Sequence, residues 1–127
     1  MLGVYSLDIG QTGRLKLCVM NKRYICTFKY NEFTVFDILT KQKIGSFVKP
    51  VANFGVSNFA LSRRADTLAF TQGKILYLKN LSTLTTAETE FVQIKRDCKL
   101  CVLAVSDDGL SVATGDEYGK IYYVSNP

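Results

Sequence analysis

The sequence contains no histidine and no tryptophan, and only two of its residues are proline. Histidine is the most common general base and the usual partner of a nucleophilic serine or cysteine, so its absence removes the ordinary routes to acid–base and covalent catalysis. Histidine is also the most common metal ligand among side chains. We therefore expect no enzymatic activity, no cofactor and no bound metal.

Long apolar runs and a secretory leader are missing too. No stretch approaches the ~18 apolar residues that a membrane span needs, and the amino terminus lacks the layout of a signal peptide. We expect no membrane contact and a reducing compartment, in which the four cysteines stay free thiols. Cys98 and Cys101 form a single Cys-x-x-Cys pair, whereas a structural zinc site needs four ligands. Cys18 and Cys26 lie on different expected strands, so a zinc or redox site is only the alternative interpretation.

Residues that favour strands are abundant. The chain has 7 Tyr and 8 Phe beside many Val, Ile and Thr, and its 127 residues fit one domain. Alternating apolar and polar runs, such as Val4 to Ile9, are separated by turn residues such as Asp107-Asp108-Gly109. The best helical candidate, Thr83 to Glu90, is short and lacks an apolar stripe, so we expect a loop there.

The strand-like runs recur with a fixed period. Residues 59–62 align with 103–106 at an offset of 44, residues 73–77 align with 119–123 at 46, and residues 33–35 align with 75–77 at 42. A repeat of about 40–45 residues with four short strands is typical of a propeller blade. The predicted fold is therefore all-β: a partial β-propeller of about three four-stranded antiparallel blades, with about twelve strands and no helix longer than about two turns.

The third repeat resembles the repeat of the WD40 family. The family's apolar-Ala-apolar-Ser, Asp-Gly and apolar-Ala-Thr-Gly motifs are matched by residues 103–106, 108–109 and 112–115, followed by Tyr118-Gly119-Lys120-Ile121. In the first repeat, Phe36-Asp37 stands where the family has Trp-Asp. The resemblance marks ten positions as structural residues of the blades: Phe36, Asp37, Ala60, Ser62, Ala104, Ser106, Asp108, Gly109, Gly115 and Gly119.

The sequence also departs from the family pattern. The Gly-His dipeptide is absent, and the Trp position is predicted to hold Phe36, Leu78 and Val124 in the three repeats. The family's Asp–His–Ser–Trp hydrogen-bond network therefore cannot form. We expect blades that are held together by apolar packing.

The repeat divides the chain into a blade end at 1–13, a blade at 14–50, a blade at 51–97 and an incomplete blade at 98–127. Closed propellers usually have 4–8 blades, so about three blades leave open faces and unpaired strand edges. We expect other protein subunits of a large complex to cover these faces. The chain alone is not expected to be a stable monomer unless it belongs to a longer polypeptide.

The net charge of +5 favours polyanions, although only weakly. Lys22-Arg23 and Arg63-Arg64 fall in equivalent loops between first and second strands, which lie on the same face of a propeller. These four residues are predicted to form a basic rim that faces RNA or a protein partner. The alternative is ordinary solubilising charge. Acidic pairs such as Asp107-Asp108 fall in expected turns and are interpreted as solvated.

Within the WD40 family, residues 56–126 look most similar to the nucleolar propeller proteins of the small-subunit processome. This resemblance rests on the polar linker at 81–95 and the motifs that follow it, and it implies scaffolding of pre-ribosomal RNA processing in the nucleus or nucleolus. Two alternatives stay open: a cytoplasmic WD40 adaptor, and the propeller of a membrane-trafficking exchange factor. RNA retention would favour the first role, and nucleotide exchange the last.

Overall fold

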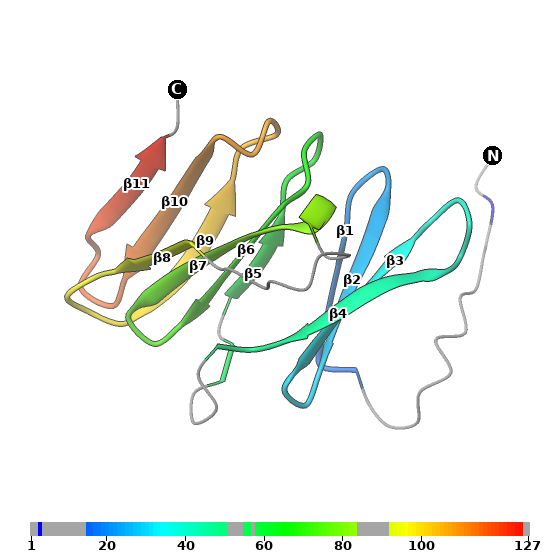
Figure 1. The fold of residues 1–127 in the computed structure, drawn as a ribbon. Coiled ribbons are helices and arrows are strands. Elements are labelled where there is room, and N and C mark those ends of the chain that lie inside the picture. The colour runs from blue at the N-terminus through cyan, green and yellow to red at the C-terminus, as the bar shows by residue number, and fades with distance from the viewer. Residues whose placement is uncertain (1–2, 4–14, 51–54, 57, 84–91, 126–127) are drawn as a thin grey trace.

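A computed structural model of the chain describes residues 3, 15–50, 55–56, 58–83 and 92–125. In these ranges the strands form three antiparallel sheets, which stand side by side in chain order and which we call blades A, B and C (Figure 1). In each blade, sequential strands pair with one another.

Each blade consists of short strands. Blade A consists of β1 (Leu17–Met20), β2 (Tyr24–Lys29), β3 (Glu32–Asp37) and β4 (Lys43–Val48). Blade B consists of β5 (Asn58–Leu61), β6 (Thr67–Gln72), β7 (Ile75–Asn80) and β8 (Val92–Lys95), with a 3-10 turn η1 (Leu81–Thr83) after β7. Blade C consists of β9 (Leu100–Val105), β10 (Ser111–Asp116) and β11 (Ile121–Ser125).

The predicted all-β class with about three antiparallel blades is confirmed: two sheets have four strands and one has three. The only helical element in the described ranges is η1, with 3 residues. The blade end expected at 1–13, the run Val4 to Ile9 and nearly all of the loop expected from Thr83 to Glu90 lie outside the described residues.

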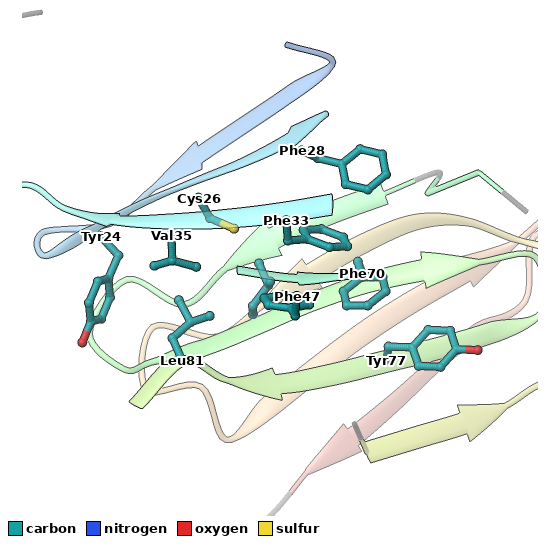
Figure 2. Close-up of a cluster of buried hydrophobic side chains, with 10 residues drawn as sticks. Tyr24, Cys26, Phe28, Phe33, Val35, Phe47, Phe70, Tyr77 and Leu81 are labelled. Carbon is teal, nitrogen blue, oxygen red and sulfur yellow. The ribbon is translucent and has the colours of Figure 1, made fainter. Parts of the chain in front are cut away.

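Blades A and B share a core rich in aromatic side chains (Figure 2). Its centre is Phe33 of β3, which is fully buried. Measured between ring centres, Phe33 lies 4.6 Å from Phe28 and 4.8 Å from Phe47 in its own blade. It lies 5.2 Å from Phe59 and 4.7 Å from Phe70 in blade B. Each such pair contributes about 0.5–1.5 kcal/mol beyond the burial of area, so one side chain ties the two blades together.

Blades B and C share a smaller, aliphatic core. Ala69 and Leu76 of blade B pack with Leu100 and Val112 of blade C, and partly buried aliphatic side chains surround them. No aromatic ring takes part in this cluster of described residues. The interface is therefore aliphatic on both sides, and Ala69 is its small residue on blade B.

The registers show which positions correspond between blades. The first turn of each blade is closed by a backbone pair, Asn21 N to Tyr24 O, Ser62 N to Thr67 O and Ser106 N to Ser111 O. Counting from these backbone pairs gives the equivalent positions in the three blades. We call the face of each blade that points toward the following blade its leading face, and on it one row of paired residues crosses the first three strands. The leading row is Val19, Cys26 and Val35 in blade A, Ala60, Ala69 and Leu78 in blade B, and Ala104, Ala113 and Tyr123 in blade C.

The same register corrects one sequence prediction. Phe36 pairs with Ile25, Val124 pairs with Val112, and the matching residue opposite Leu68 is Lys79. Lys79, not Leu78, therefore occupies the family's Trp position in the second repeat. The prediction was wrong by one residue, and a slip of one residue moves a side chain to the other face of a sheet. Lys79 is 2% exposed, and its Nζ lies 5.8 Å from the centre of the Phe47 ring of blade A.

Candidate interaction surfaces

The four residues of the predicted basic rim lie around one depression. The turns after β1, β5 and β9 follow one edge of the three blades, the upper edge in Figure 1. A cavity of about 690 Å³ opens there, and its lining includes all four rim residues, Lys22, Arg23, Arg63 and Arg64. Asp66 and Asp108 line the same cavity, so carboxylates interrupt the positive charge.

The rim turns are fixed by one polar side chain at the start of each turn. In blade B, Ser62 Oγ donates to Ala65 O at 2.7 Å and accepts from Thr67 N at 3.1 Å. Ser62 is fully buried. The hydroxyl thus closes the turn locally without the histidine that the family pattern would supply.

Asn21 holds the corresponding position in blade A, and the sequence comparison missed it. Its Oδ1 accepts from Arg23 N at 2.9 Å and from Tyr24 N at 2.8 Å, which closes its own turn. Its Nδ2 donates across the interface to Ser62 O at 3.0 Å and Ala65 O at 3.3 Å. Asn21 therefore joins the first rim turn to the second. The available signal was an asparagine 41 residues before Ser62, directly ahead of Lys22-Arg23.

In blade C, Ser106 is the corresponding residue. Its hydroxyl donates to Asp108 Oδ1 at 2.6 Å and accepts from Ser111 N at 3.0 Å. The hydrogen bond from Ser106 lowers the pKa of Asp108, and a further bond from Leu110 N has the same effect. The residues after Ser106 are acidic, whereas those after Asn21 and Ser62 are basic, so the rim changes sign along its length.

The second and third rim turns also interlock. Arg64 N donates to Asp107 O at 2.7 Å, across the interface between blades B and C. Gly109 has φ +73, and a Cβ at this position would lie 2.7 Å from Thr67 Oγ1 and 3.0 Å from Ala65 Cβ. Both the left-handed backbone and the close approach of blade B therefore require glycine here.

The leading face of blade C is open. Val102 is 61% exposed, Ile121 74% and Tyr123 75%. Ala104 is exposed, and Gly115 lies beside Val102, whose Cγ2 would be 2.6 Å from a Cβ at that position. Blades A and B bury the corresponding faces in the cores that they share with the next blade.

The remaining predicted blade positions lie in strands and turns of the blades. Phe36 is buried, and Asp37 Oδ1 accepts from Leu39 N and Thr40 N at the end of β3. Ala60 pairs with Ala69 across β5 and β6. Gly119 has φ +85 in the β10–β11 turn, with nothing within 4 Å of its Cβ position.

The cysteines do not come together. All four are free thiols; Cys18 and Cys101 are exposed, and burial raises the pKa of Cys26 above its ordinary value. Among the described residues, no group of three or more His, Cys, Asp or Glu is placed to hold a metal. In the same residues, no helix is long and apolar enough to cross a membrane.

Comparisons with known proteins show the fold of the chain. No protein-family model matches the sequence, and no curated protein matches it significantly. A chain of the mitotic checkpoint complex matches with a TM-score of 0.61 at 16% identity, over 88% of this chain and 36% of that one. The C-terminal WD40 domain of Sif2 matches with a TM-score of 0.62 at 10% identity, over 84% of this chain and 32% of that one. This chain thus spans about a third of each, and its fold is that of consecutive blades of a WD40-type β-propeller.

Proposed function

We propose that this chain is a non-enzymatic interaction scaffold, and that the leading face of blade C docks a further antiparallel blade supplied by a partner protein. The observation that carries the proposal is the row Ala104, Ala113 and Tyr123. The corresponding rows of blades A and B pack against the next blade, whereas the Tyr123 side chain of blade C is 75% exposed.

The shape of this face indicates what fits it. In the B–C interface, Ala69 leaves room for Val105, Val112 and Leu103 of blade C. Blade C repeats the small residues, with Ala104 and Ala113 at the centre of its own leading face. A partner sheet that presents valine- and leucine-sized side chains would continue the B–C interface by one blade.

The energy of such a contact is large on the scale of a small domain. Each Å² of apolar surface removed from water contributes about 25 cal/mol, so a few hundred Å² contributes several kcal/mol. Total stabilities are about 5–15 kcal/mol. An exposed apolar sheet face of this kind is typical of an interface.

The test compares two tyrosines by light scattering on the purified chain. Tyr123 and Tyr30 are exposed to similar extents, 75% and 73%, but Tyr30 lies at the β2–β3 turn, away from the leading face. We expect the chain to self-associate at micromolar concentration, Tyr123→Lys to reduce the association strongly, and Tyr30→Lys to leave it unchanged. A cooperatively unfolding monomer, or equal effects of both variants, would contradict the proposal. A stable dimer of defined size would show that the occupant is a second copy.

The finer proposal is a role in the small-subunit processome, in the nucleus or nucleolus, as a scaffold for pre-ribosomal RNA processing. Its support is the sequence resemblance of residues 56–126 and the position of Lys22, Arg23, Arg63 and Arg64 around one depression. RNA retained by the chain at moderate salt would favour this role over a general adaptor. Accelerated nucleotide exchange on a GTPase would instead favour the trafficking alternative.

A further inference from the structure

A second cationic surface lies at the strand ends opposite the rim. There the β6–β7 turn, the β8–β9 connection and the β10–β11 turn meet, along the lower edge in Figure 1. Backbone bonds join them: Arg96 N donates to Lys74 O at 2.8 Å, and Glu117 N donates to Lys99 O at 3.2 Å. Three segments far apart in sequence thus bring their basic residues to one place.

The centre of this surface is an aromatic ring between two cations. The Tyr122 ring has Arg96 Cζ at 4.6 Å and Lys120 Nζ at 5.2 Å from its centre. We define the Tyr122 cluster as Lys74, Arg96, Lys99, Tyr118, Lys120 and Tyr122. In the part of the chain that the structure describes, none of its four cations pairs with a carboxylate. Arg96 Nε is buried and has no hydrogen-bond partner there.

Tyr118 adds a free aromatic face. Its side chain is 80% exposed at the tip of the β10–β11 turn. The turn has a defined shape, because Asp116 Oδ1 accepts from Tyr118 N at 2.9 Å and from Lys120 N at 3.0 Å. An exposed ring held beside unpaired cations can stack a base while the cations contact phosphates.

We propose that the Tyr122 cluster binds single-stranded nucleic acid, with Tyr118 stacking on a base and Lys74, Arg96, Lys99 and Lys120 contacting the phosphates. A single strand is required because a stacked duplex does not offer its bases to an aromatic side chain. An acidic peptide would use the cations but would gain less from the exposed ring. This site is independent of the docking face, and it gives the proposed RNA role a second location.

The rim is less suited to the same ligand. Arg23 lies 4.9 Å from the Tyr24 ring, but Tyr24 is only 3% exposed and cannot stack a base. Asp66 and Asp108 also line the rim cavity. The Tyr122 cluster instead places an accessible aromatic surface, the Tyr118 ring, in the same turn as one of its cations, Lys120.

The test measures the anisotropy of labelled oligouridine and oligothymidine with the full chain at several salt concentrations. Stacking on an aromatic side chain is worth about 1–3 kcal/mol per base, so Tyr118→Ala should weaken binding about tenfold. The double variant Lys99→Gln/Lys120→Gln should reduce the slope of log affinity against log salt by about 1.4, since each phosphate contact on a single strand contributes about 0.7. The matched control is Lys16→Gln/Lys43→Gln, which removes the same charge from blade A and should leave the slope unchanged.

Circular dichroism is used to check that each variant keeps the fold. If the Lys99→Gln/Lys120→Gln variant does not fold, the single variant Lys74→Gln takes its place. Equal losses in both double variants would reduce the effect to net charge and overturn the proposal. The proposal would also be overturned if Tyr118→Ala bound the oligonucleotide normally, or if polyglutamate of equal charge competed as well as the oligonucleotide. It would be overturned too if only the Arg63→Gln/Arg64→Gln variant lost binding. A preference for uridine over thymidine strands would identify RNA as the ligand. Loss of binding without a change in self-association would leave the docking proposal untouched.

Discussion

Replacing Asn21 by alanine should loosen the joint between blades A and B at the rim. The Asn21 side chain makes two kinds of bond, one set to the amides of its own turn and one set to carbonyls of the next blade. The local set resembles the capping of a turn, whose loss typically costs about 1 kcal/mol. The bonds across the interface are neutral and partly exposed, and a net contribution of about 1 kcal/mol is ordinary for such bonds. We therefore expect Asn21→Ala to lower the free energy of unfolding by about 2 kcal/mol.

Serine separates the two contributions, because serine is the residue found at the corresponding positions of blades B and C. Asn21→Ser can still accept from the turn amides but cannot reach the next blade, so we expect about half the loss. The measurement is urea unfolding followed by circular dichroism at one fixed protein concentration, because association changes apparent stability. For a chain of this size 2 kcal/mol corresponds to a shift of roughly 6–10 °C in Tm. An Asn21→Ala variant within about 0.5 kcal/mol of the parent would refute the reasoning, and so would a serine variant as damaged as the alanine variant.

Gly109→Ala should destabilise the chain by about 2 kcal/mol in urea unfolding, because strain at positive φ is added to a close approach of blade B. Gly119→Ala, with strain alone and open space around it, should cost about 1 kcal/mol; equal losses would argue against the contact. The Cys26 thiol has a raised pKa and is buried, so it should react with an aromatic disulfide reagent only at the rate of unfolding, and rapid labelling in the native state would contradict this. The pKa of Asp108 is lowered in the folded chain, so its contribution to stability is present above the ordinary carboxyl pKa and is lost as pH falls through the folded value. Carbon-13 titration should show this pKa rising in Ser106→Ala, and an unchanged value would contradict the hydrogen-bond explanation.

Strand positions could be predicted from alternation and turn residues, but the register of β7 could not. The match of Gly73-Lys74-Ile75 with residues 119–121 suggested one alignment, and the observed pairing gives another. Ile75 pairs with Gln72 across a short turn, whereas Ile121 pairs with Gly115 across a longer one. Similar residues in turns of different length do not occupy equivalent positions. For this reason the sequence alignment predicted Leu78 at the family's Trp position, where the fold has Lys79.

The two candidate surfaces differed in how visible they were in the sequence. The four rim cations stand as adjacent pairs, and the repeat places both pairs in equivalent turns, which the structure brings to one depression. The members of the Tyr122 cluster come from three non-equivalent connections, and only the packing of blade C on blade B brings them together. Gly119-Lys120-Ile121 matches a strand motif of the family, and nothing in that motif marks the neighbouring tyrosines as a binding surface.

The order of the blades follows from the sizes of facing rows. The leading row of blade A, centred on Cys26, packs against blade B where Leu61 and Leu68 stand. The leading row of blade B is smaller, centred on Ala69, and it meets the shorter Val112 of blade C. If the blades that face these two rows were exchanged, the leucines of blade B would meet the smaller row and would be overpacked. The valine of blade C would meet the larger row and would leave a cavity. Blade C repeats the small centre of blade B, but it has the larger Tyr123 where blade B has Leu78. The blade that docks there therefore needs a small or polar residue opposite the Tyr123 ring. This requirement distinguishes a specific partner from a second copy of blade C.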